Sequence, residues 1–113
     1  MPSVITSSSN TKIKLVKVLQ NHARSRQSEG AFVIEGVRLV EEAVRASWPV
    51  QFVLYDETLS KRGLDLVNTI QSEPGIAVSE ISPGLMKEIS DTETPQGILA
   101  VLGRESLTPP KSP

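Results

Sequence analysis

Residues 31–55 read AFVIEGVRLVEEAVRASWPVQFVLY, and this stretch indicates the fold class. Residues 31–35 form a short apolar run of strand type that is closed by Gly36. Apolar residues then recur with helical spacing over residues 37–48, and residues 50–55 are strand-like again. A strand, a helix and a second strand in this order are typical of an α/β protein.

The alternation of helices and strands continues on both sides of this unit. Further helices are predicted at 11–23, at about 58–74 and at 82–89, and further strands at 76–78 and 97–102. Asn10 is a suitable cap for the first of these helices. Because apolar strands separated by helices favour a parallel sheet covered on both faces, we expect a three-layer α/β/α sandwich with a four-stranded, mainly parallel sheet.

Composition excludes several classes of function. The chain has 113 residues, one histidine and no cysteine, so disulfides, thiolate nucleophiles and multi-histidine metal sites are excluded. A single domain of this length buries its own core without such staples. No apolar run approaches the roughly 20 residues of a membrane span, and no secretory leader is visible. We therefore expect a cytoplasmic protein that has no membrane or metal partner.

Positive charge is concentrated near the N-terminus of a chain whose formal net charge is −1. Residues 7–26 contain five Lys or Arg and no Asp or Glu. On a helix, Lys14 and Lys17 project opposite the apolar stripe, with no acid at neighbouring turns. In residues 38–45, by contrast, acidic and basic side chains cancel at i,i+3 and i,i+4. An uncancelled basic face suits phosphates, although it also serves solubility, so both interpretations stay open.

Other site types lack support in the sequence. No glycine-rich phosphate loop follows a predicted strand, which disfavours a small-molecule-binding α/β domain. The few aromatic residues do not indicate a base-stacking platform, so any bound RNA is expected to be recognised by shape and backbone. Glu88, Asp91 and Glu93 flank a turn, and we interpret them as a solvated loop rather than a metal site.

Three stretches in this order resemble the N-terminal substrate-binding domain of SpoU/TrmH-type (SPOUT) RNA 2′-O-ribose methyltransferases. They are NTKIKLVKVL (10–19) with RSR (24–26), FVIEGVRLVEEA (32–43) and TETPQGILAV (92–101). The resemblance implies a fold like that of the kink-turn-binding ribosomal proteins. It also implies a domain that presents structured rRNA or tRNA to a catalytic domain, and that this catalytic domain, which binds S-adenosylmethionine, is absent from the chain.

Composition and the resemblance together predict a division of the chain. Residues 1–9 would be a flexible lead-in, residues 10–103 the RNA substrate-binding domain, and the proline-rich residues 104–113 a linker toward the catalytic domain. We expect this chain to be monomeric and inactive alone, with no cofactor, whereas the full-length protein would dimerise through the catalytic domain. The alternative is a stand-alone RNA-binding or ribonucleoprotein scaffold module with no catalytic partner domain.

The candidate RNA contacts come from the resemblance and from charge geometry. The resemblance places four residues in the family's basic front motif: Asn10, Lys12, Arg24 and Arg26. Charge geometry adds Lys14 and Lys17. Two turns, at Glu35–Gly36 and at Gln96, are further candidates. Gly36 would let a phosphate approach the N-terminus of the next helix, and the side chain of Gln96 would reach RNA. A structural role is favoured at both turns, with Glu35 accepting backbone N–H groups.

Overall fold

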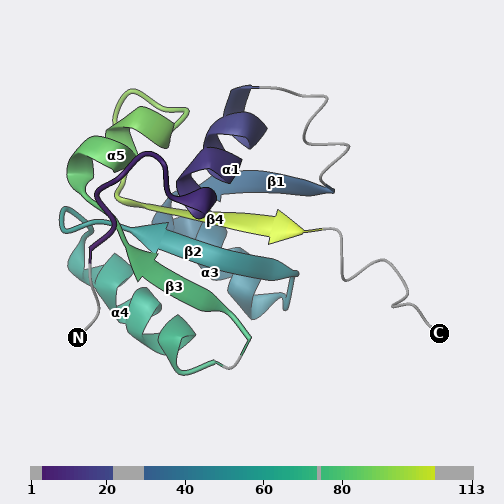
Figure 1. Cartoon of the computed structure of the whole chain (residues 1–113). Helices are drawn as coiled ribbons and strands as arrows, with labels where there is room; N and C mark the ends of the chain where they lie inside the picture. The colour runs from purple at the N-terminus through teal and green to yellow at the C-terminus, as the bar shows by residue number, and fades with distance from the viewer. Residues whose placement is uncertain (1–3, 22–29, 74, 104–113) are drawn as a thin grey trace.

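The computed structural model describes residues 4–21, 30–73 and 75–103. These residues form four helices and four strands that alternate as the sequence predicts (Figure 1). The strands are β1 (Ala31–Glu35), β2 (Val50–Tyr55), β3 (Ala77–Glu80) and β4 (Ile98–Gly103). The helices are α1 (Thr11–Asn21), α3 (Val37–Arg45), α4 (Lys61–Gln71) and α5 (Pro83–Ile89). The α/β class is confirmed.

The sheet is mixed, and the predicted mainly parallel sheet is wrong. The strand order is β1-β4-β2-β3. Strand β4 lies between β1 and β2 and is antiparallel to both, whereas only β2 and β3 pair in parallel. As a result β1, β2 and β3 all end at one end of the sheet, which is the end where β4 begins.

The reversal of β4 follows from where the chain lies after α5. Helix α5 has seven residues and is therefore about 10 Å long at its rise per residue. The six residues of β4 span about 20 Å as a strand. Helix α5 and the loop that follows it leave the chain at the end of the sheet where β3 stops, so β4 begins there and runs antiparallel to β2.

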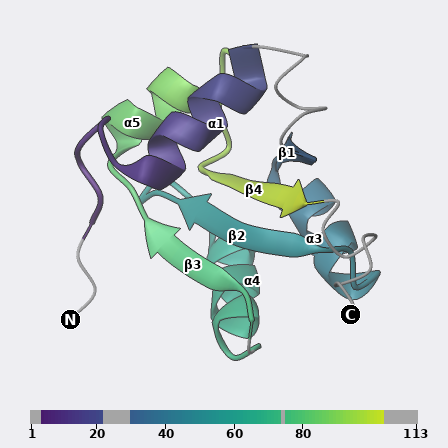
Figure 2. The ribbon, with the colours of Figure 1, turned by 45° about the vertical axis from the view of Figure 1, so that its right-hand side comes forward.

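The core consists of two apolar clusters, one on each face of the sheet. Helices α1 and α5 pack over one face, and α3 and α4 pack over the other (Figure 2). Strand β4 is buried along its whole length. It contributes Leu99 and Val101 to the α1–α5 side and Ile98, Ala100 and Leu102 to the α3–α4 side. An apolar strand without alternation is thus explained by burial on both faces.

Local hydrogen bonds define where several elements begin. The hydroxyl of Ser60 accepts from the N–H of Gly63 at 3.1 Å, and the hydroxyl of Ser82 accepts from the N–H of Leu85 at 3.3 Å, so both serines cap helices. In the expected lead-in, the N–H of Ile5 donates to the carbonyl of Glu80 at 2.8 Å. Among the described residues, no helix has the length and apolar character needed to cross a membrane.

Candidate nucleic-acid interface

Asn10 caps α1, as the sequence predicts. Its side-chain Oδ1 accepts a hydrogen bond from the backbone N–H of Lys12 at 2.8 Å. Its backbone carbonyl accepts from the N–H of Lys14 at 3.0 Å. Because Oδ1 is engaged in the cap, the side-chain NH₂ is the part of Asn10 that remains suited to donate to an RNA phosphate or base.

The three lysines of α1 differ in their availability. Lys14 is exposed and makes no ion pair with another described residue. Lys12 is half-buried, and its Nζ lies 5.7 Å from the centroid of the Phe52 ring, within cation–π range. Lys17 forms an ion pair with Glu88, with 2.5 Å between Nζ and Oε2. Lys14 is therefore the most available of the three for a phosphate.

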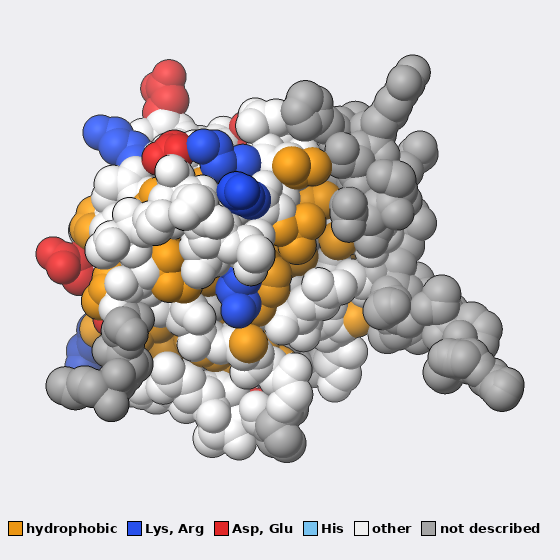
Figure 3. Space-filling view, in the orientation of Figure 1, with side chains coloured by type: hydrophobic (Ala, Val, Ile, Leu, Met, Phe, Trp, Pro, Cys, Tyr) orange, Lys and Arg blue, Asp and Glu red, His pale blue; other side chains and the backbone are white. Residues whose placement is uncertain are grey.

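The expectation that no acid lies within reach of this helix face is wrong at Lys17. Glu88 belongs to α5 and lies 71 residues further along the chain, so helical spacing does not reveal it. Acidic and basic side chains lie next to each other along the upper margin of Figure 3. The surface over α1 and α5 is of mixed charge, and its positive potential is weaker than α1 alone suggests. Arg24 and Arg26 lie outside the described residues.

Glu35 connects the end of β1 to two other segments. One carboxylate oxygen accepts from the hydroxyl of Ser90 at 2.5 Å. The other accepts from the backbone N–H of Asp91 at 2.7 Å and from the side-chain amide of Gln20 at 2.9 Å. These bonds hold the start of the α5–β4 loop against α1. Both carboxylate oxygens are thus engaged, which supports the structural role that the sequence favours for Glu35.

Gly36 and Gln96 meet at the N-terminus of α3. Gly36 has φ of +101°, which favours glycine, and it offers no side chain to cap the helix. Instead, the side-chain Oε1 of Gln96 accepts from the backbone N–H of Val37 at 3.2 Å. A Cβ added at Gly36 would lie 3.1 Å from the same oxygen. Gln96 therefore caps α3 at the helix N-terminus that was the candidate phosphate site, in agreement with the structural role that the sequence favours for this turn.

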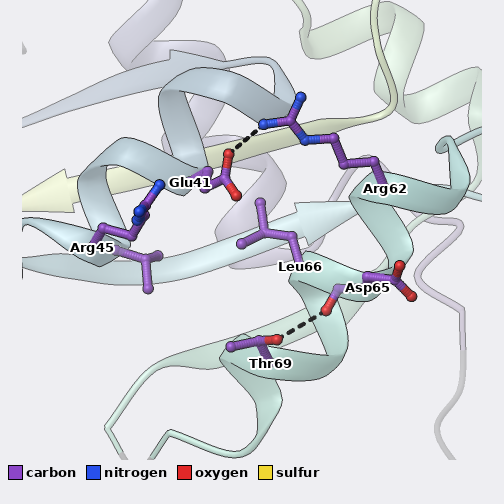
Figure 4. Close-up of a pocket in the computed structure, with 7 residues that line it drawn as sticks. Glu41, Arg45, Arg62, Asp65, Leu66 and Thr69 are labelled. Atoms are coloured by element: carbon purple, nitrogen blue, oxygen red, sulfur yellow. Dashed lines mark hydrogen bonds and ion pairs between the residues drawn. The ribbon is translucent and has the colours of Figure 1, made fainter.

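A hollow of about 340 Å³ lies between α3 and α4, on the other face of the sheet (Figure 4). Val44 and Leu66 contribute apolar surface to it. Its rim carries both signs of charge, because Arg62 pairs with Glu41 at 2.6 Å and Arg45 lies beside them. The prediction that charges cancel within this helix is wrong at Glu41, because Glu41 pairs with Arg62 of α4 and no ion pair joins two of the described residues of α3.

The acidic residues near the α5–β4 loop do not form a metal site. Glu88 lies in α5 and is paired with Lys17, while Asp91 and Glu93 are exposed in the loop. No group of three His, Asp or Glu residues in the described part of the chain is arranged to hold a metal ion.

Asp56 is a further polar residue, and its burial is not evident from the sequence. It follows β2 and is 2% exposed, the only charged side chain buried among the described residues. Its Oδ1 accepts from the backbone N–H of Thr58 at 2.8 Å and from the Thr58 hydroxyl at 2.6 Å. Its backbone N–H donates to the carbonyl of Gly97 at 3.0 Å. An aspartate followed two residues later by threonine, after an apolar run, is the sequence signal for such a turn.

Comparison with known proteins identifies the class of domain. The family model described as MRM3-like substrate binding domain matches residues 10–100. The chain is 33% identical over 98 residues to the 23S rRNA (uridine(2479)-2'-O)-methyltransferase of Streptomyces viridochromogenes, covering 84% of this chain and 33% of that protein. It is 36% identical over 98 residues to the 23S rRNA (guanosine(2553)-2'-O)-methyltransferase RlmP of Bacillus subtilis (strain 168), covering 86% and 36% respectively.

Solved structures show the same fold. An RNA 2'-O ribose methyltransferase matches with a TM-score of 0.75 and 26% identity, over 98% of this chain and 41% of that chain. The SpoU methyltransferase AviRb from Streptomyces viridochromogenes, in complex with AdoMet, matches with a TM-score of 0.68 and 28% identity, over 83% and 33%.

The fold and the comparisons together define a substrate-binding domain of the SpoU/TrmH methyltransferase type. The chain belongs to the MRM3-like substrate binding domain family, which confirms the resemblance seen in the sequence. It spans about a third of the length of the curated relatives that it matches.

Proposed function

We propose that this chain binds structured rRNA or tRNA as the substrate-recognition domain of an S-adenosylmethionine-dependent ribose 2′-O-methyltransferase. The family match over residues 10–100 is the observation that carries this proposal. A phosphate-binding surface on the same domain is supported by three residues at the start of α1. Lys14 is exposed, Lys12 lies in the first turn, and Asn10 caps the helix. Such contacts position RNA without reading its sequence, so binding is expected to be salt-dependent.

The fold is consistent with recognition of RNA by shape. Helices cover both faces of the sheet, which supports a three-layer sandwich like that of the kink-turn-binding ribosomal proteins. We include Lys17, Arg24 and Arg26 among the contacts, with Glu35, Gly36 and Gln96 as candidates at the neighbouring turns. Because Glu35 and Gln96 are held by hydrogen bonds inside the domain, their contribution is to fix those turns.

Methyl transfer is assigned to a part of the protein outside this chain. The relative AviRb was solved with AdoMet, and the match covers 33% of its chain. Here the hollow between α3 and α4 is lined by as many basic as acidic residues, Arg45 and Arg62 with Glu41 and Asp65, so it offers no net negative charge to a sulfonium cation. We therefore derive no catalytic step from these residues. The proposal also includes a monomeric state for this chain and a linker at residues 104–113. For the full-length protein it includes a dimer formed through the catalytic domain and a cytoplasmic location.

The binding surface is tested by titrating labelled 23S rRNA fragments and tRNA with matched charge-reversal variants. We expect Lys14→Glu to weaken binding and to lower the slope of log K against log salt concentration by about 1 for each phosphate that the variant no longer neutralises. Lys61→Glu is the control, because Lys61 is exposed at the start of α4 on the opposite face and undergoes the same charge change. Equal effects of the two variants would remove α1 from the interface.

The stand-alone alternative makes the same binding prediction and differs in its coupling to catalysis. The experiment that separates the two replaces the matching third of the Bacillus subtilis relative with this chain. Restored methylation of rRNA supports a domain that serves a methyltransferase. RNA binding without methylation supports a separate binding module.

A further inference from the structure

We propose that the hollow between α5 and the segment after β2 binds one unpaired guanine base. This inference rests on the proposed RNA-binding function and adds a base-specific site to it. The hollow has a volume of about 320 Å³ and is lined by Asp56, Thr58, Pro83, Met86, Lys87 and Pro95. A volume near the lower end of the roughly 300–1,000 Å³ typical of ligand pockets suits a single base.

The position of the hollow is one that α/β proteins commonly use. It lies at the end of the sheet where β1, β2 and β3 all stop, and ligands of α/β sheets bind outside the carboxyl ends of strands. Helix α5, the connection from β2 to α4 and the loop before β4 meet there (Figure 1). The same loop contributes Pro95 to the hollow and Gln96 to the cap of α3.

Asp56 supplies an acceptor that the domain itself leaves available. Thr58 donates both of its hydrogen bonds to Oδ1, and no described residue donates to Oδ2. No buried side-chain nitrogen or oxygen in the described part of the chain lacks a partner, so Oδ2 retains access to solvent. With the residue only 2% exposed, a donor that reaches Oδ2 forms a charge-assisted hydrogen bond in a largely dry setting.

The chemistry of the lining favours guanine over the other bases. Guanine presents N1–H and N2–H₂ side by side, so two donors converge on one carboxylate oxygen. Uracil presents one N–H between two carbonyls, which the carboxylate repels, and adenine and cytosine place a ring acceptor beside the amine. The apolar groups of Pro83, Met86 and Pro95 suit the face of a base, and exposed Lys87 suits its phosphate.

The test compares GMP, AMP, CMP and UMP as probes in NMR titrations of the ¹⁵N-labelled chain. We expect GMP to shift the amides of Thr58 and Met86 and to bind at least about tenfold tighter than UMP, as a charge-assisted hydrogen bond implies. Lys87→Gln should lower the affinity for all four nucleotides by a similar factor, because the substitution removes the cation that faces the phosphate. Equal dissociation constants for the four nucleotides, or shifts confined to another surface, overturn the proposal.

Asp56→Asn isolates the acceptor. The amide oxygen still accepts from Thr58, whereas the NH₂ group replaces Oδ2 and opposes the donors of guanine. We expect Asp56→Asn to lower the affinity for GMP about tenfold and to leave the affinity for UMP unchanged. Asp65→Asn at the α3–α4 hollow is the control and should change neither affinity. If Asp56→Asn does not fold, the four nucleotides on the unaltered chain and Lys87→Gln decide the question.

The outcome separates the two proposals. RNA binding that is sensitive to Lys14→Glu but shows no guanine preference overturns only the base site. A guanine preference without binding of structured RNA overturns only the function proposed for the domain.

Discussion

Replacing Glu35 with alanine should be one of the most destabilising changes at a charged residue of this domain. The carboxylate accepts three hydrogen bonds, from Ser90, Asp91 and Gln20. Hydrogen bonds to a charged group contribute about 1.5–3 kcal/mol each. Even the lower sum, about 4.5 kcal/mol, overstates the loss, because Glu35 is only half-buried and the N–H of the exposed Asp91 rehydrates. We therefore expect Glu35→Ala to lower the free energy of unfolding by about 2–4 kcal/mol.

Glu35→Gln should cost much less than Glu35→Ala. Its single oxygen still serves Asp91 and Gln20, while its NH₂ group faces the Ser90 hydroxyl, which also accepts from the N–H of Thr92 at 3.2 Å. A hydroxyl rotates to accept, so we expect a loss of about 1 kcal/mol or less.

Urea unfolding monitored by circular dichroism measures both changes. With a slope of about 2 kcal/mol per molar urea, Glu35→Ala should lower the midpoint by about 1–2 M. Glu42→Ala on the exposed face of α3 is the control and should stay within about 0.5 kcal/mol of the unaltered protein. The reasoning is refuted if Glu35→Ala costs less than about 1 kcal/mol, or if the glutamine and alanine variants are equally destabilised.

Three further changes test other features of the structure. Gly97→Ala should cost about 2 kcal/mol or more by urea unfolding, because Gly97 has φ of +84° and its Cβ would lie 2.8 Å from a carboxylate oxygen; a neutral result contradicts this. Glu88→Gln should change stability by less than about 1 kcal/mol yet raise RNA affinity about two- to fivefold, because it frees Lys17; weaker binding in the same RNA titration counts against the interface. Burial, and then the charge of Glu80, raise the pKa of Tyr55 above its ordinary value of 10.0. The protonated phenol therefore stabilises the folded state at pH values below the unfolded-state pKa, and this stabilisation is lost as pH rises through the folded-state pKa. Urea midpoints between pH 8 and 11 should therefore fall less steeply in Tyr55→Phe, and parallel curves contradict that pKa shift.

The sequence predicted the elements of the fold but not the direction of the last strand. Burial on both faces produces the uninterrupted apolar run of residues 98–102, and this run was compatible with a parallel strand or an antiparallel one. The deciding feature was the end of the sheet at which α5 and its loop leave the chain, because β4 begins there. Residue propensity predicted the start of α5 at Ser82 and Pro83 correctly. Where the connection between two strands ends depends on three-dimensional packing, which residue propensity does not describe.

The candidate site shows a similar division between local and tertiary information. The cap at Asn10 and the structural role of Glu35 depend on residue type and turn position, so the sequence indicated them. The pairing of Lys17 with Glu88 depends on the packing of α1 against α5, which places residues far apart in sequence side by side. A helix face whose positive charges have no acidic partner within the helix can therefore find such partners on another helix of the folded domain.

The loop between α5 and β4 is held at both ends, and this bears on how the domain could read RNA. Glu35 fixes its start through Ser90 and Asp91, and Gln96 fixes its end on the N-terminus of α3. Recognition of a base requires acceptors and walls that are positioned before binding, whereas a phosphate tolerates a mobile lysine. The exposed Lys14 of α1 suits binding of a phosphate, whereas the loop beside Asp56, which is held at both ends, suits recognition of a base. Specificity and affinity are thus expected to reside on different elements, so variants of Asp56 should alter base preference and variants of Lys14 the salt dependence.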